Sequence, residues 1–155
     1  MLSEEILEKN LQRVHQWIAS ADTKISVSLA LEGVLITLIM PFLVTRYQVL
    51  KDLNVCLYVF LIVGALSLIL SFCFFLAGLF PQVKNKRKSL TFFGDISNTS
   101  YDQYKKEIED CNIEKYREDL ISQVHVSSIV ASKKYSSFKK GLVLLKGTPF
   151  LRQQF

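Results

Sequence analysis

The chain has 155 residues, of which 50% are apolar, and a formal net charge of +5. This length fits one domain, or a membrane hairpin with a small attached module. From Leu53 to Val83, 31 consecutive residues include no Asp, Glu, Lys or Arg. A soluble domain has little use for such a run, so the composition argues against a secreted disulfide scaffold, a disordered tail and a freely soluble enzyme. It indicates a membrane protein.

Two stretches are long and apolar enough to cross a bilayer, whose hydrocarbon core is about 30 Å thick. Residues 25–44 form the first predicted span and residues 55–80 the second, which Pro81 ends. A cleaved signal peptide does not explain the first span, because 24 mostly helical residues of mixed charge precede it. The predicted fold class is an all-α membrane protein, with a two-helix transmembrane hairpin and a small cytoplasmic helical module.

Basic residues near the spans predict their orientation. Four of the five residues 84–88 are Lys or Arg, whereas the loop 45–52 contains only two. Both termini are therefore expected in the cytoplasm and the loop outside. Recognition is then confined to residues 1–24 and 81–155. The basic residues at 84–88 are interpreted as a topology signal that contacts lipid headgroups.

Helical periodicity continues outside the spans. Apolar residues at three- and four-residue steps predict a helix from about residue 4 to residue 44. Residues 89–97 are interpreted as an irregular or short extended segment. Two capped helices are expected after it, at about 101–111 and from 113 to about 143 or slightly beyond, the second ended by the Gly-Thr-Pro sequence at 147–149.

The expected caps are Ser100 or Thr99 for the first of these helices and Asn112 for the second. Residues 141–145 are apolar but form a short stretch. The pattern leaves open whether residues 141–151 touch the membrane.

The chain has no recognisable catalytic or metal-binding pattern. His15 and His125 are the only histidines and lie about a hundred positions apart, and Cys56, Cys73 and Cys111 lack metal-ligand spacing. We therefore expect a protein that is not an enzyme and that needs no metal or cofactor.

Glu32 is the most informative single residue. An ionised carboxylate in the middle of a membrane costs at least about 2.5 kcal/mol, so it normally faces protein, water or a partner. One interpretation is a polar contact that shapes an oligomer or a pore. The other is a protonated carboxyl buried in the hairpin and hydrogen-bonded to Ser28 or a neighbouring hydroxyl.

Lysine pairs at 133–134 and 139–140 lie beside Tyr135 and Phe138. They form either a solvated helix face or a site for the phosphate and base of a nucleotide. Long nucleic acid is not an expected partner, because the basic surface is small and lies against a membrane.

Three sequence elements, in this order, resemble the two-span effectors of bacterial Pycsar antiphage systems. They are WIASADTK at 17–24, FFGDI at 92–96, and a serine at 128 followed by KKY at 133–135. The resemblance covers roughly residues 11–140. It implies an effector of the bacterial inner membrane that senses cyclic CMP or cyclic UMP, made on infection by a pyrimidine cyclase, and impairs that membrane, causing abortive infection. The two-span effectors of CBASS systems share this outline, which leaves the identity of the messenger open.

A cyclic mononucleotide needs a cation for its phosphate and an aromatic or polar slot for its base. The resemblance therefore directs attention to the lysines and aromatic residues of the three elements. Asp95 either belongs to this site or caps a turn after Gly94. The candidate ligand-binding residues are Lys24, Phe92, Phe93, Asp95, Lys133, Lys134 and Tyr135, with Trp17 and Asp22 at the membrane edge and Glu32 inside the membrane.

The expected partners are the lipid bilayer, a cyclic mononucleotide as activating ligand, further copies of the chain in a homo-oligomer, and a nucleotide cyclase as functional partner. Two other classes of function stay open. One is a constitutive membrane scaffold or a subunit of a channel or transporter. The other is a membrane toxin regulated by a partner protein.

Overall fold

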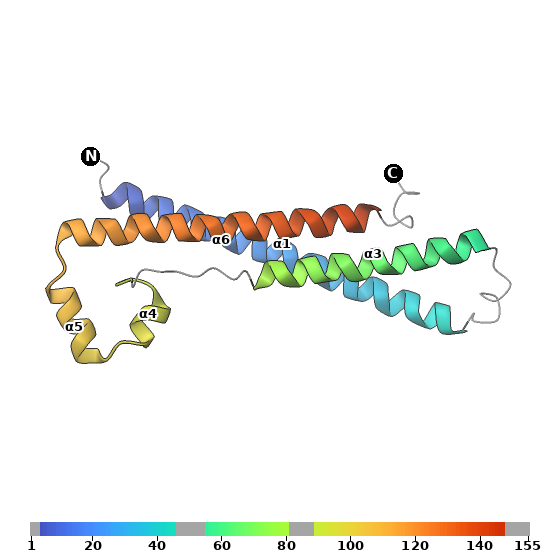
Figure 1. Ribbon diagram of the computed structural model, residues 1–155, viewed down its shortest axis with the longest axis horizontal. Coiled ribbons are helices and arrows are strands. Elements are labelled where there is room, and N and C mark those ends of the chain that lie inside the picture. The colour runs from blue at the N-terminus through green and yellow to red at the C-terminus, as the bar shows by residue number, and fades with distance from the viewer. Residues whose placement is uncertain (1–3, 46–54, 81–88, 148–155) are drawn as a thin grey trace. The chain divides into compact units, whose positions relative to one another are not determined.

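The computed structural model describes residues 4–45, 55–80 and 89–147 (Figure 1). These residues form helices and connecting turns, without a strand among them. The helices are α1 (Glu4–Thr45), α3 (Val55–Leu79), α4 (Phe93–Ser97), α5 (Tyr101–Glu109) and α6 (Ile113–Gly147). Two of them, α1 and α3, are long and apolar enough to cross a membrane. The predicted fold class, an all-α membrane protein, is thus confirmed. The predicted loop after α1 and the basic residues at 84–88 lie outside the described residues.

The described residues divide into two compact units. Unit 1 contains residues 4–20 and 89–132, and unit 2 contains residues 21–45, 55–80 and 133–147. Both α1 and α6 contribute their first part to unit 1 and their last part to unit 2.

Unit 1 packs the first part of α1 against the first part of α6. Leu7 and Val14 of α1 are buried, as is Leu120 of α6. The Tyr116 hydroxyl on α6 donates a hydrogen bond to Glu8 Oε1 on α1, with an O–O distance of 2.8 Å. This hydrogen bond raises the pKa of Tyr116 above its ordinary value, because the neighbouring carboxylate favours the protonated phenol.

The segment predicted to be irregular or extended contains a short helix, α4, so that part of the prediction was wrong. Ser89 organises its start: the Ser89 hydroxyl oxygen accepts from the backbone N–H groups of Thr91 and Phe92, both at 3.1 Å. The Asp95 carboxylate in turn accepts from the Ser89 backbone N–H at 2.8 Å. Side-chain hydrogen bonds of this local kind are not visible in an apolar pattern.

The two predicted helix caps are confirmed. Ser100 Oγ accepts from the backbone N–H of Gln103 at the start of α5, and Asn112 Oδ1 accepts from that of Lys115 at the start of α6. Helix α6 ends at Gly147, the first residue of the stretch 147–149 that was predicted to end it.

Unit 2 packs the last part of α6 antiparallel to α3. The Ser67 hydroxyl donates to the Leu144 carbonyl oxygen at 2.8 Å, and the Ser71 hydroxyl donates to the Gly141 carbonyl oxygen at 3.0 Å. Residue numbers therefore rise along one helix as they fall along the other, and Figure 1 shows the C-terminal end of α6 (red) beside α3 (green).

Glycine allows the close approach of α6 to α3. A Cβ atom on Gly141 would lie 2.6 Å from Cε1 of Phe75, and the Phe75 ring is fully buried. On α3, a Cβ atom on Gly78 would lie 2.9 Å from Cδ1 of Ile25 in α1. Small residues at helix contacts are a common feature of packing in membranes.

Candidate functional site

A buried lysine joins the three helices of unit 2 where α3 ends. Lys134 of α6 is 5% exposed, and its Nζ lies 2.5 Å from Oδ1 of Asp22 in α1. The same ammonium group donates to the carbonyl oxygen of Leu79, the last residue of α3, at 3.2 Å. Because the last carbonyls of a helix have no partner within the helix, Lys134 both pairs with α1 and caps α3.

This arrangement gives Lys134 a structural role. A buried ammonium group is tolerated only when it is paired and hydrogen-bonded, and Asp22 and Leu79 supply these partners. The sequence left Lys134 open as a phosphate-binding cation, but its ammonium is already engaged. It therefore links α1 and the end of α3 to α6 in this structure.

The next contact between α1 and α6 involves a more exposed cation, Lys24. Lys24 is exposed, and its Nζ lies 5.4 Å from the ring centroid of Tyr135. Asp22 and Lys24 thus contact successive residues of α6, which means that α1 and α6 run parallel here. Lys133 precedes the buried lysine on α6 and is exposed. Near the Asp22–Lys134 pair, α1 thus carries one exposed lysine, Lys24, and α6 carries another, Lys133, together with the partly exposed Tyr135.

Glu32 is deeper in unit 2 and fully buried by its own chain. Neither of its carboxyl oxygens has a geometrically acceptable hydrogen-bond partner in the part of the chain that the structure describes. The Ser71 hydroxyl, which is also fully buried, donates to the Gly141 carbonyl oxygen. Glu32 thus lies in the interior of unit 2, and the hydrogen bond to Ser28 or a neighbouring hydroxyl that one interpretation included is not formed among the described residues.

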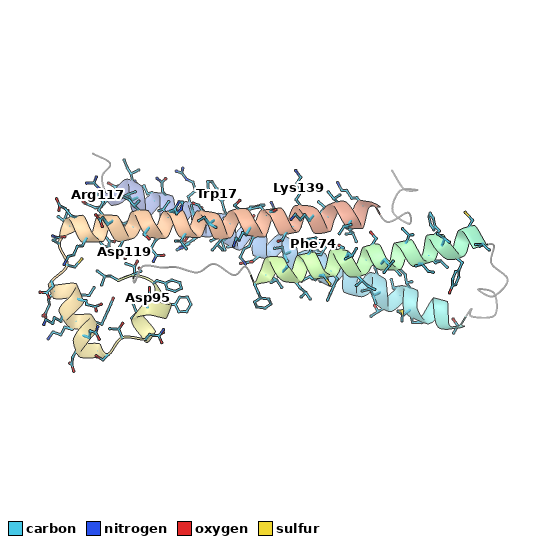
Figure 2. The ribbon with its side chains drawn as sticks, viewed as in Figure 1. Trp17, Phe74, Asp95, Arg117, Asp119 and Lys139 are labelled. Atoms are coloured by element: carbon cyan, nitrogen blue, oxygen red, sulfur yellow. The ribbon has the colours of Figure 1, made fainter. Side chains whose placement is uncertain are left out.

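In unit 1, two aspartates hold the loop that contains the FFGDI element. Asp119 Oδ2 on α6 accepts from the Ser89 hydroxyl at 2.9 Å and from the Leu90 backbone N–H at 3.1 Å. Asp95 on α4 binds the other side of the same serine, at its backbone N–H. Figure 2 shows Asp119 projecting from α6 and Asp95 from α4. Asp95 therefore closes a turn, one of the two roles that the sequence left open for it.

The two phenylalanines of that element form an exposed aromatic pair. Their ring centroids are 4.8 Å apart, and Phe93 is 77% exposed. The Phe92 ring lies over Gly94, where a Cβ atom would come within 2.6 Å of Cε1. An exposed aromatic surface of this kind is suited to stacking against a base.

The predicted site residues thus form two clusters. Lys24, Lys133, Lys134 and Tyr135 belong to unit 2 together with Asp22, whereas Phe92, Phe93 and Asp95 belong to unit 1 together with Trp17. Trp17, labelled in Figure 2, is 51% exposed; its interpretation as an interfacial anchor stays a prediction.

Sequence reasoning missed Asp119, Ser89 and the capping role of Leu79. Asp119 and Ser89 are 30 positions apart, and no spacing rule connects a loop serine to a helical aspartate. Leu79 acts through its backbone carbonyl, which leaves no signal in the sequence. Among the described residues, no group of three or more His, Cys, Asp or Glu side chains could hold a metal ion.

Comparison with known proteins shows which family the sequence resembles. The sequence model of the Pycsar effector protein domain matches residues 6–149. The chain is also similar to the Pycsar effector protein GmPycTM of Gulbenkiania mobilis, with 27% identity over 168 aligned positions that cover 91% of this chain and 84% of the relative. No solved structure matches the chain.

Proposed function

The chain belongs to the Pycsar effector family, and from this premise we propose that it binds a cyclic pyrimidine mononucleotide, cyclic CMP or cyclic UMP, and impairs the bacterial inner membrane in response. Effectors of this family serve antiphage defence and work with a cyclic-nucleotide signal made by a cyclase. The proposal adds the ligand class, the inner membrane with both termini in the cytoplasm, and a homo-oligomer as the active form.

The observation that carries the proposal is the position of the exposed lysines. Lys133 and Tyr135, the ring that Lys24 contacts, flank Lys134 in the chain, and Lys134 ties α1, α3 and α6 together. A ligand bound at Lys24 and Lys133 therefore acts directly on the contacts that fix the three helices of unit 2. The effect of the ligand on helix packing then requires no long-range allosteric pathway.

The chemistry of the ligand fits these side chains. The single phosphate charge of a cyclic mononucleotide pairs with Lys24 and Lys133, and its base stacks on Tyr135. The present contact between Lys24 and the Tyr135 ring is worth only about 0.5–1 kcal/mol at an exposed site, so a phosphate can replace it. Binding then separates Lys24 from Tyr135, and the phosphate competes with Asp22 for the Lys134 ammonium.

Ligand binding changes the membrane only if the ligand prefers one packing of the helices over another. We propose that the bound phosphate weakens the Asp22–Lys134 pair and thereby frees α6 from the end of α3. The rearranged hairpins then associate differently, and the membrane loses its barrier function.

Equilibrium binding to the purified, detergent-solubilised protein tests the site. Cyclic CMP or cyclic UMP should bind, and Lys24→Ala and Lys133→Ala should each weaken binding at least about tenfold, or about 1.4 kcal/mol. Lys105→Ala is the matched control, because Lys105 is a similarly exposed lysine, 3.8 Å from Glu109 in unit 1, and its loss removes the same charge. Equal binding by all three variants would contradict the proposal that the ligand binds at Lys24 and Lys133. Loss of binding in Phe93→Ala alone would move it to the aromatic pair of unit 1.

A further inference from the structure

The last part of α6 runs beside α3 as far as the middle of that helix. Ser67 is the thirteenth of the 25 residues of α3, and its hydroxyl binds the Leu144 carbonyl. One turn nearer the end of α3, Ser71 binds the Gly141 carbonyl. The end of α6 is therefore held at the midpoint of a helix that is long and apolar enough to cross a membrane.

A bilayer cannot be placed on α3 in a way that leaves this end of α6 in water. At 1.5 Å per residue, the 25 residues of α3 are about 37 Å long, and the hydrocarbon layer is about 30 Å thick. If that layer begins at Val55, Ser71 lies about 6 Å and Ser67 about 12 Å inside its far edge. If it instead ends at Leu79, the two depths are about 12 Å and 18 Å. In both limits the partners of these serines on α6 lie inside the hydrocarbon.

The contacts at this depth provide hydrogen bonds for backbone carbonyl groups that would otherwise be unpaired in the hydrocarbon layer. The last four carbonyl groups of a helix lack intrahelical partners, and an unpaired carbonyl is costly inside hydrocarbon. Leu144 is the first of these four residues in α6, which ends at Gly147, and Ser67 supplies its missing donor. Gly141 allows the backbone of α6 to approach the buried ring of Phe75.

The outward side of this part of α6 combines an apolar residue with lysines that can reach polar surroundings. Val143 is 61% exposed. Lys140 stands nearer the membrane edge, with its Nζ 5.7 Å from the ring of Phe74, and long lysine side chains extend toward the headgroups from such positions. Lys146 in the last turn brings a further charge to a greater depth, and a charge there draws water into the layer.

From this register we infer that residues 138–147 of α6 form a third membrane-embedded helix, which enters the apolar layer beside α3 and ends near its middle without crossing it. The occupant of its outward face is lipid acyl chains. The inference does not depend on which side of the membrane holds the termini, nor on any messenger.

Depth-dependent fluorescence quenching tests the inference in the full chain. The chain has one tryptophan, so a Trp17→Phe background allows a single reporter to be introduced as Val143→Trp. The protein is reconstituted in phosphatidylcholine vesicles whose acyl chains carry bromine near mid-chain, without nucleotide. Emission should fall at least about twofold relative to unbrominated vesicles, because the reporter lies within the hydrocarbon. Aqueous iodide should have little effect.

Ile113→Trp is the matched control, because Ile113 begins the same helix in unit 1 and is 70% exposed. This reporter should be quenched by iodide and not by bromine. Quenching of the Val143→Trp reporter by iodide alone would overturn the inference, since α6 would then end in water. Resistance of that reporter to both quenchers would overturn it as well, because protein rather than lipid would cover the face. As a second variant, Val143→Cys in a chain whose native cysteines are replaced by alanine should resist a membrane-impermeant maleimide, and its rapid labelling would contradict the inference.

Discussion

Two lysine–carboxylate pairs have nearly the same length but very different surroundings. Lys134 and Asp22 are 2.5 Å apart, with side chains 7% and 40% exposed. Lys9 and Glu5 are 2.6 Å apart, with side chains 65% and 74% exposed. Distance alone would rank them equally. Burial predicts that the first pair stabilises the fold and that the second contributes little.

Asp22→Asn should therefore destabilise the protein by about 1–3 kcal/mol, because it leaves the Lys134 ammonium buried without its counter-charge. Asp22 is partly exposed, which keeps this value below that of a fully buried pair. The companion change Glu5→Gln should cost no more than about 0.5 kcal/mol. Thermal unfolding in detergent, followed by circular dichroism, measures both. Equal losses in the two variants would show that the Lys134 pair is no more than a surface contact.

Tyr116 makes the stability of unit 1 depend on pH in the alkaline range. Its hydrogen bond to Glu8 raises its pKa in the folded protein above the ordinary value near 10. Because the folded-state pKa is the higher one, the stabilisation is fully present below pH 10 and is lost as the pH rises through the raised pKa.

Wild-type protein should therefore unfold at a higher temperature than Tyr116→Phe at pH 8, by the equivalent of about 0.5–1.5 kcal/mol for one hydrogen bond. Above the raised pKa, the phenolate faces a carboxylate and this advantage should vanish. Thermal melts of the two proteins at intervals between pH 8 and pH 11.5 follow the difference. A difference that stays constant over the whole range would contradict the assignment.

At the scale of elements, the contact between α3 and α6 depends on a glycine. Gly141→Ala places a methyl group against the buried Phe75 ring and should destabilise the protein by about 1–3 kcal/mol through overpacking. Gly64→Ala on α3 is the control, because among the described residues no atom beyond its own turn of helix lies within 4 Å of the added Cβ. That change should be neutral or slightly stabilising, since alanine favours a helix. The two melting temperatures separate the outcomes, and a harmless Gly141→Ala would exclude the close contact.

The helices themselves were largely predictable, because the spans, the caps and the long first helix follow from apolar periodicity and capping residues. The partners of Ser67 and Ser71 on α6 could not be predicted. Those partners are backbone carbonyls, which every residue carries. The end of α6 at Gly147 was also predictable, because glycine and the proline at 149 favour the end of a helix.

The sequence predicted the residues of the candidate site better than their individual roles. The sequence singled out the lysines at 133–134, yet it could not tell which one is buried. Helical spacing places neighbours about 100° apart, so one of the pair, Lys134, faces the helices of unit 2 and the other, Lys133, is exposed. The assignment of roles required the positions of Asp22 and Leu79.

At the scale of the whole molecule, the proposed function joins two properties of unit 2. Its exposed lysines can receive an anionic ligand, and the buried lysine beside them fixes the packing of the membrane helices. Both properties belong to a few residues at one end of the helical hairpin. In the proposed function, a small ligand bound at these lysines therefore alters membrane packing through contacts within unit 2.

The most direct test is dye release from vesicles that contain the reconstituted protein, after addition of cyclic CMP, cyclic UMP, cyclic AMP or a cyclic dinucleotide. The account predicts release with a pyrimidine mononucleotide, little with the others, and loss of the response in the Lys24→Ala, Lys133→Ala double variant but not in Lys105→Ala. Release that is equal with and without every nucleotide would contradict the account in favour of a toxin held in check by a partner. Vesicles that stay sealed under all conditions would contradict it in favour of a constitutive membrane scaffold.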